Sequence, residues 1–398
     1  MPWTETFVMD QRVDFITRSL AKSANFEALC REFGISRKTG YKWRERFFSE
    51  GLSGLRDHSR RPKRTPTEVD EAMVCEAIKF KLAHREWGAR KIRAVLAKVR
   101  PGVDLPSESS FKRIFDRAGL VEHRRRRRTQ SQGERLQTPV RAERPNQVWT
   151  IDFKGWWYTL DRHRFEPLTV RDDYSRYVLC AQALPDARTE TVQAQMTRVF
   201  ERHGLPEVIR SDNGSPFAAR NSPLGLSRLS AWWLTLGVNL DRIEPGRPDQ
   251  NGGHERMHRD MAIAVERRAA ADLISQQAEL DVWRQTFNEE RPHEALGMRV
   301  PNDVYARSPR RFDPSQVKLE YPSGYDVRKV SHVGGIKIQR RAINVSVALR
   351  GYDIGLEPVK ANHYMVWFCR TLLGELDVAA EKFSHVFHDQ ENQRMPQE

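Results

Sequence analysis

The central part of the sequence opens on Val148-Trp149-Thr150-Ile151-Asp152-Phe153-Lys154, an apolar and β-branched run that contains a single carboxylate. Runs of this composition and length are typical of buried β-strands. Two further short runs, 165–171 and 177–183, follow at the spacing of turns. We therefore predict a meander of three strands, with Asp152 close to the end of the first.

Helices and strands alternate after this meander. The pattern predicts helices over 189–203 and 227–236, and strands over 208–210 and 238–243. Strands followed by alternating helices and strands favour a mixed sheet with helices on both faces, in an α/β domain. The fourth strand would place Asp212 just past its C-terminal end, in the stretch Ile209-Arg210-Ser211-Asp212-Asn213-Gly214.

A third acidic residue, Glu255, falls near the start of a helix predicted over 252–271. The apolar stripe of this helix is formed by Met257, Met261, Ala264 and Val265. At about 100° per residue, Glu255 lies well over about 90° from the centre of that stripe. Its side chain therefore points either into a site or into solvent, where it would form a surface pair with Arg259.

Three carboxylates brought together from two strands and a helix suit a hard divalent cation, because such ions choose oxygen ligands. We interpret Asp152, Asp212 and Glu255 as the ligands of a two-metal centre for phosphodiester chemistry. The expected ion is Mg²⁺, for which Mn²⁺ can substitute. We do not include four neighbouring residues among the ligands. Asp172 and Asp173 are expected to cap a turn and to pair with arginines, and His254 and His258 are expected to contact phosphate or to lie on the plain surface.

The front of the chain is strongly basic. Residues 1–144 account for the whole net charge of +14, so residues 145–398 sum to zero. A basic front half joined to a neutral back half indicates a nucleic-acid-binding segment. A basic surface that serves solubility is the alternative.

Two helical modules are predicted in this basic half. In the first, Gly34-Ile35 breaks a helical pattern and Ser36 is suited to cap a helix running to about Phe48, which is the helix-turn-helix arrangement. A second such module follows in 66–123, where Ser107 caps a helix that Gly119 ends. An ordinary helical bundle is the alternative for the first. The expected DNA contacts of the two modules are Arg37, Lys38, Thr39, Lys42, Arg44, Arg90, Lys91, Lys112 and Arg113.

The remaining segments complete a five-part layout. A linker carries five consecutive arginines that repel one another until phosphates neutralise them, namely Arg124, Arg125, Arg126, Arg127 and Arg128. Short alternating runs near the C-terminus, punctuated by glycines, predict a small β-barrel. The expected domains are a helix-turn-helix domain at 1–60, a second one at 66–123, the linker at 124–144, the α/β domain at 145–310 and the barrel at 317–388, with a disordered tail at 389–398.

Composition also bears on the environment of the protein. The four cysteines are far apart in sequence, so neither a zinc cluster nor a disulfide framework is expected, and a reducing cytosol fits. We find no apolar run of the roughly 18 residues that a membrane span needs. The first residues do not have the pattern of a signal peptide. We expect a cytoplasmic, nucleoid-associated protein.

Assembled in this order, the pieces resemble the DDE transposases of bacterial insertion sequences, whose catalytic core is similar to that of retroviral integrases. The resemblance rests on five stretches in the order of that family: Trp149-Thr150-Ile151-Asp152-Phe153, Asp172-Asp173-Tyr174-Ser175-Arg176-Tyr177, Ser211-Asp212-Asn213-Gly214, Gly246-Arg247-Pro248-Asp249-Gln250-Asn251-Gly252 with Glu255, and Asn288-Glu289-Glu290-Arg291-Pro292-His293-Glu294-Ala295-Leu296. It implies an RNase H-like fold, with Asp152, Asp212 and Glu255 as metal ligands.

Two departures from the retroviral pattern stand out. The spacing from Asp212 to Glu255 is longer, and we expect the extra residues in a surface insertion at Phe217–Arg228. The longer spacing makes Glu244 a rival of Glu255, although Glu244 precedes a Pro-Gly pair at a strand end. The front of the chain has helix-turn-helix elements where retroviral integrases carry a zinc-binding His/Cys module.

The resemblance implies a DNA transposase that works as a homo-oligomer in a synaptic complex. Its partners would be double-stranded DNA, both element ends and target DNA, with Asn251, Arg256 and Arg259 beside the scissile strand. A catalytically silent DNA-binding regulator derived from a transposase is the alternative, and a stand-alone RNase H-like nuclease is a third hypothesis.

Overall fold

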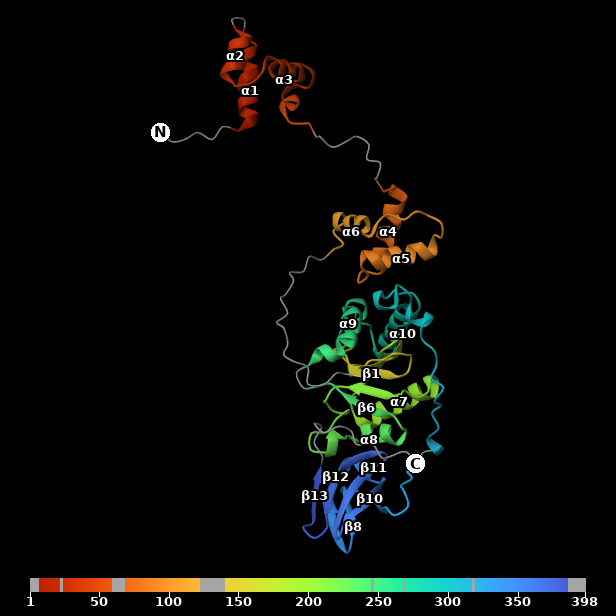
Figure 1. The fold of residues 1–398 in the computed structure, drawn as a ribbon. Coiled ribbons are helices and arrows are strands. Elements are labelled where there is room, and N and C mark those ends of the chain that lie inside the picture. The colour runs from red at the N-terminus through yellow and green to blue at the C-terminus, as the bar shows by residue number, and fades with distance from the viewer. Residues whose placement is uncertain are drawn as a thin grey trace, which may run out of the picture. The chain divides into compact units, whose positions relative to one another are not determined.

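The computed structural model describes residues 7–21, 24–58, 69–121, 140–244, 247–267, 269–316 and 319–385. The chain forms two compact units, Met1–Glu68 and Val69–Glu398, whose elements are labelled in Figure 1. The five arginines of the expected linker and the expected disordered tail lie outside the described residues.

The first unit is a small helical domain, built from α1 (Val8–Ser19), α2 (Phe26–Glu32) and α3 (Arg37–Glu50). The Ser36 hydroxyl accepts a hydrogen bond from the Thr39 amide at 3.2 Å, which caps α3 as predicted. Helices α2 and α3 cross closely at Gly40, where a Cβ atom would lie 2.7 Å from the Cys30 sulfur. This contact and the turn before Ser36 produce the helix-turn-helix arrangement.

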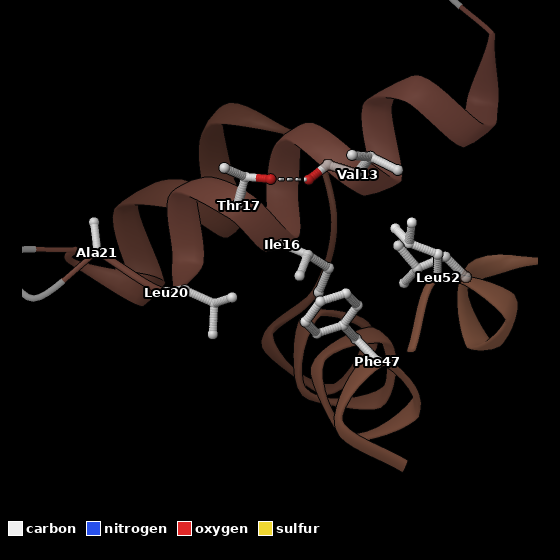
Figure 2. Close-up of a pocket in the computed structure, with 8 residues that line it drawn as sticks. Val13, Ile16, Thr17, Leu20, Ala21, Phe47 and Leu52 are labelled. Atoms are coloured by element: carbon white, nitrogen blue, oxygen red, sulfur yellow. Dashed lines mark hydrogen bonds between the residues drawn. The ribbon is translucent and has the colours of Figure 1, made fainter. Parts of the chain in front are cut away.

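A pocket of about 400 Å³ opens between α1, α3 and the 3₁₀ turn η1 (Gly51–Leu55). Figure 2 shows its lining side chains, among which the Thr17 hydroxyl donates to the Val13 carbonyl at 2.9 Å. The rest of the lining is aliphatic or aromatic: Val13, Ile16, Leu20, Ala21, Phe47, Leu52 and Leu55. An apolar wall whose hydroxyl already has an acceptor does not suit a phosphate or another charged ligand.

The second unit begins with three helices, α4 (Glu71–Ala83), α5 (Ala89–Val99) and α6 (Glu108–Arg117). The Ser107 hydroxyl caps α6 by accepting from the Ser110 amide at 3.2 Å. The inward residues of α6 are Phe111, Ile114 and Phe115. They pack with Trp87, Ile92 and Leu96 in a core of their own.

A mixed sheet follows, which confirms the predicted α/β centre of the chain. Its strands are β1 (Val148–Phe153), β2 (Trp157–Tyr158), β3 (Arg164–Asp172), β4 (Val178–Leu184), β5 (Val208–Ser211) and β6 (Asn239–Arg242). The order is β2-β3-β1-β5-β6, with β4 on β3. Strands β1, β3 and β4 are antiparallel neighbours, whereas β5 runs parallel to both β1 and β6.

Helices cover both faces of this sheet. On one face, α7 (Thr189–His203) and α8 (Arg228–Thr235) pack against Trp149 and Ile151 of β1. On the other face lie α9 (Gly252–Met261) and α10 (Leu273–Glu289), as Figure 1 shows. Because successive strand residues alternate between faces, Thr150 and Asp152 are directed to the side of α9. The catalytic hypothesis depends on this placement.

The helix expected over 252–271 ends earlier than predicted. After α9 the chain forms a π-helical turn, η4 (Ala262–Glu266), and α10 begins after Asp272, whose carboxylate accepts from the Ser275 amide at 2.7 Å. Asp272 thus caps a separate helix. The expected inward stripe still holds, since Met257, Met261 and Val265 are buried.

The predicted β-barrel at the C-terminus is not confirmed, because the described strands do not form a closed barrel. A five-stranded antiparallel sheet runs in the order β13-β12-β11-β10-β7, and β8 and β9 form a separate hairpin. The strands are β7 (Asp326–Lys329), β8 (Gly335–Ile338), β9 (Arg341–Asn344), β10 (Asp353–Lys360), β11 (His363–Phe368), β12 (Thr371–Asp377) and β13 (Lys382–His385). Closure would require the two edge strands to pair, and β7 and β13 instead remain at opposite edges.

The segment Phe217–Arg228, expected as a surface insertion, is largely buried. Phe217 packs in the core of the α/β domain, while Leu226 joins the core of the C-terminal sheet. Ser222 and Ser346 are hydrogen-bonded through their hydroxyls at 2.8 Å. The extra residues therefore connect the α/β domain to the C-terminal sheet.

Among the described residues, we find no helix with the length and apolar character that crossing a membrane requires.

Candidate catalytic site

Two of the three carboxylates are brought together by neighbouring parallel strands. In the pairing of β1 with β5, Thr150 lies opposite Arg210. Asp152 lies two residues further along β1, and Asp212 directly follows the last residue of β5. Parallel neighbours end at the same edge of a sheet, so both carboxylates lie at the C-terminal ends of their strands.

The negative charges of Asp212 and Glu255 both act on the carboxylate of Asp152. Burial, together with the negative charge of Asp212 and, more weakly, that of Glu255, raises the pKa of Asp152 to about 7. The side chain of Asp152 is 26 % exposed, whereas Asp212 and Glu255 are exposed. Neighbouring carboxylates repel one another, and a bound cation would relieve that repulsion.

The loop that carries Asp212 is fixed at both sides. Its carboxylate accepts a hydrogen bond from the Gly214 amide at 3.1 Å. A Cβ atom on Gly214 would lie 3.1 Å from the Asp212 carboxylate, so a larger residue would crowd it. Asn213 donates from its side-chain amide to the Ile243 carbonyl at 2.6 Å. Each residue of the Asp-Asn-Gly stretch thus helps to hold the carboxylate at the strand edge.

Glu255 lies in the first turn of α9, which packs closely on the sheet. A Cβ atom on Gly253 would lie 2.5 Å from the Arg171 guanidinium, so this position excludes side chains. Arg171 is buried, and burial lowers its pKa to about 10. The negative charge of Glu255 is among the causes that raise the pKa of Asp152, which favours Glu255 over its rival Glu244.

Turn capping by Asp172 and Asp173 agrees with the sequence interpretation. Asp172 accepts hydrogen bonds from the amides of Ser175 and Asn146. Asp173 pairs with Arg171 at 2.7 Å and with Arg176 at 2.9 Å. Both carboxylates are therefore committed to the turn between β3 and β4.

The prediction that His254 and His258 lie on an exposed helix face is wrong. Their exposed fractions are 0 % and 9 %, and both rings bond to the Thr169 hydroxyl beneath α9. Burial lowers the pKa of His254 well below its usual range and that of His258 to about 3, so both rings are neutral. The signal was in the sequence: His254, Met257, His258 and Met261 follow the i, i+3, i+4, i+7 pattern of an inward stripe.

The structure also describes one group of possible metal ligands in this region. Asp152, His254 and His258 offer ligand atoms within 4.8 Å of one another. The Asp152 carboxylate lies 4.0 Å from Nδ1 of His258. Sequence reasoning did not include these histidines in the site.

The residues expected to contact DNA through α3 are accessible. Arg37, Lys38 and Lys42 are exposed, while Thr39 and Arg44 are half-buried. The guanidinium of Arg44 lies over the rings of Phe26 and Tyr41. The helix thus presents cations on its outer surface, as a DNA-reading helix requires.

The expected contacts in the second module divide into two pairs. Lys112 and Arg113 are exposed on α6. Arg90 instead forms ion pairs with Glu108 at 2.8 Å and with Glu294 at 3.1 Å, and the half-buried Lys91 has its pKa lowered to about 8 by burial. A phosphate at Arg90 would have to displace those carboxylates.

The residues expected to contact DNA beside the carboxylates differ in their exposure to solvent. Arg256 and Arg259 are exposed on α9, next to Glu255. Asn251 is buried at 7 %, and its side-chain oxygen has no hydrogen-bond partner among the described residues. The five arginines of the expected linker lie outside the described residues, so their role stays a prediction.

Comparisons with known proteins agree with this architecture. The integrase core domain family matches residues 142–248, and a second integrase core family matches 236–301. A homeodomain-like family matches 39–115, and a helix-turn-helix family matches 11–63. These matches support helix-turn-helix domains in the basic front half and an integrase-like core in the α/β domain.

Two insertion-element proteins and one solved structure are similar to parts of this chain. An insertion element IS407 protein of Burkholderia multivorans is 28% identical over 61% of this chain and 83% of its own length. An insertion element IS476 protein of Xanthomonas euvesicatoria is 27% identical over 65% of this chain and 71% of its own. The catalytic core of BIV integrase, 21% identical, covers 40% of this chain and 93% of its own at a TM-score of 0.32. The family matches and the two insertion-element relatives confirm the resemblance to insertion-sequence transposases with an integrase-like core.

Proposed function

We propose that this chain, which carries helix-turn-helix domains ahead of an integrase core, is a DNA transposase that cleaves element ends and joins them to target DNA. The observation that carries the proposal is the shared environment of Asp152, Asp212 and Glu255. Burial and the two neighbouring charges raise the pKa of Asp152 to about 7. A carboxylate cluster of this kind suits divalent cations, Mg²⁺ or Mn²⁺, because hard ions take oxygen ligands.

In the proposed mechanism, the protein residues hold the reacting groups in place. Asp152, Asp212 and Glu255 would hold two divalent cations. Two divalent ions bound there would lower the pKa of the attacking oxygen and stabilise the departing one. Arg256 and Arg259 contact phosphates of the scissile strand, and Asn251 and Gly252 let the backbone approach it.

The proposed reaction has two steps at the same site. Water first attacks the phosphorus at the element end, so a P–O bond breaks and the element keeps a free 3′-hydroxyl. That hydroxyl then attacks a phosphorus of target DNA, forming a new phosphodiester and displacing a 3′-hydroxyl of the target strand. No covalent bond to the protein forms. DNA binding by α3 and α6 and assembly of several copies on paired ends belong to the same proposal.

A strand-transfer assay with a labelled element end and Mg²⁺ or Mn²⁺ tests the proposal. We expect joined product from the wild-type protein, and no product from Asp152→Asn, whose DNA binding persists. Asp161→Asn is a matched control, since Asp161 lies in the hairpin between β2 and β3 and is half-exposed. Cleavage without joining would support the nuclease hypothesis. A shifted but unreacted DNA band from the wild-type protein would support the silent regulator.

A further inference from the structure

The hydroxyl of Thr169 has three hydrogen-bond partners beneath α9. It lies 3.0 Å from the Asp152 carbonyl, 2.6 Å from Nε2 of His254 and 2.7 Å from Nε2 of His258. A hydroxyl has one proton and two lone pairs, and a carbonyl oxygen can only accept. The Thr169 proton therefore goes to the Asp152 carbonyl. Both imidazoles must then donate from Nε2 to Thr169.

This arrangement fixes the tautomer of each histidine. A neutral imidazole that is protonated on Nε2 has a bare lone pair on Nδ1. In His254 that lone pair accepts from the Thr150 hydroxyl at 2.8 Å, a much shorter contact than the 3.4 Å from the same hydroxyl to the Arg171 carbonyl. Both nitrogens of His254 are thus engaged, and His254 is not available to a cation.

Nδ1 of His258 is in a different position. It faces the Asp152 carboxylate at 4.0 Å, which is too long for a hydrogen bond. With Asp152 ionised, both atoms are acceptors, and His258 is buried to 9 % exposure. Two acceptors that face each other in a buried place are unfavourable unless a positive charge lies between them. This pair of atoms is therefore preorganised to receive a cation.

We propose that His258 is a nitrogen ligand of the divalent cation that Asp152 holds, so that the catalytic centre offers an imidazole in addition to its three carboxylates. The inference rests on the proposed function and extends it. Bonds of about 2.0–2.2 Å to one ion allow two donors to lie up to about 4.4 Å apart, and the observed 4.0 Å falls within that span. Thr169 is a positioning residue, because its hydroxyl holds the ring in the required tautomer.

An imidazole ligand changes which ion the site prefers. Sites made of carboxylates and water suit Mg²⁺, whereas a nitrogen donor raises the affinity for first-row transition ions relative to Mg²⁺. The site should therefore bind Mn²⁺ more tightly than Mg²⁺, and the preference should depend on His258.

Mn²⁺ binding to the full-length protein, followed by electron paramagnetic resonance without DNA, tests this inference. Mg²⁺ affinity is obtained by competition. His258→Gln retains an N–H near the Nε2 position for Thr169 and removes the nitrogen donor. We expect its Mn²⁺ affinity to fall by about ten- to a hundred-fold, with a much smaller fall for Mg²⁺ and an unchanged unfolding temperature. Thr169→Val should weaken Mn²⁺ binding, whereas Thr169→Ser should retain it.

His163→Gln is the matched control, because Nδ1 of His163 also faces a carboxylate, that of Asp161 at 2.8 Å, but on the surface. It should bind Mn²⁺ like the wild type. Unchanged Mn²⁺ affinity in His258→Gln, with the affinity lost in Asp152→Asn, would overturn the role of His258 and leave the proposed function standing. Equal loss of both ions together with a lower unfolding temperature would show a packing role and also overturn the inference. Retained Mn²⁺ affinity in Asp152→Asn would overturn the proposed function itself.

Discussion

Asp152→Asn should make the metal-free protein more stable at alkaline pH even though it removes the central catalytic group. The pKa of Asp152 is raised from 3.8 to about 7 in the folded protein, first by burial and then by the charge of Asp212. One pKa unit corresponds to about 1.4 kcal/mol, so ionised Asp152 costs the folded state about 4 kcal/mol at pH 8. Asparagine occupies the same volume without the charge and avoids this cost.

The sign of the pH dependence follows from the direction of the shift. A carboxyl with a raised pKa in the folded state binds its proton more tightly there than in the unfolded chain. Its stabilising contribution is complete below about pH 4 and is lost as the pH rises through about 7. The wild type should therefore lose up to about 4 kcal/mol relative to Asp152→Asn between pH 4 and pH 8.

Urea titrations of the wild type and of Asp152→Asn, in chelator at several pH values, measure this difference in the free energy of unfolding. Added Mn²⁺ should restore the stability of the wild type at pH 8 and have little effect on the variant. Asp161→Asn serves as the control, because the Thr159 hydroxyl lowers the pKa of Asp161 and its loss gives no gain at pH 8. Parallel pH profiles of the wild type and Asp152→Asn would refute the reasoning.

Three further predictions concern the surroundings of the site. Gly253→Ala should lower the free energy of unfolding by about 1–3 kcal/mol through overpacking, because its Cβ would lie 2.5 Å from Arg171. Gly252→Ala is the control, since a Cβ there would have nothing within 4 Å, and it should leave the free energy of unfolding unchanged in the same urea titration. Asp173→Asn should cost about 3–5 kcal/mol in unfolding free energy, since it leaves the buried Arg171 charge without its partner; a change below about 1 kcal/mol would contradict that pairing. Lys112→Glu should weaken binding to element-end DNA and reduce the salt dependence of that binding. If the salt dependence measured in a band-shift titration did not change, Lys112 would not contact the DNA.

The sheet was accessible to sequence reasoning because it depends on local alternation. Trp149 and Ile151 are apolar and Asp152 is not, so a period of two places the carboxylate opposite the core of β1. Asp212 follows its strand directly, and parallel pairing brings the two together. The exposure of Glu255 followed from the period of its helix in the same way.

The histidines were missed because their partners come from distant strands. His254 and His258 fall on the inward stripe of α9, but a buried imidazole is acceptable only where hydroxyls satisfy it. Those hydroxyls belong to Thr150 and Thr169, which nothing in the local pattern of α9 reveals. The barrel prediction, which is not confirmed, has a related limit: short alternating runs predict strands, whereas closure depends on how strands far apart in the chain pair.

The most direct measurement is anomalous diffraction from crystals of this protein grown with Mn²⁺. We predict anomalous peaks from Mn²⁺ ions that are bonded to carboxylate oxygens of Asp152, Asp212 and Glu255. Strong anomalous peaks elsewhere, with none among these three side chains, would contradict it.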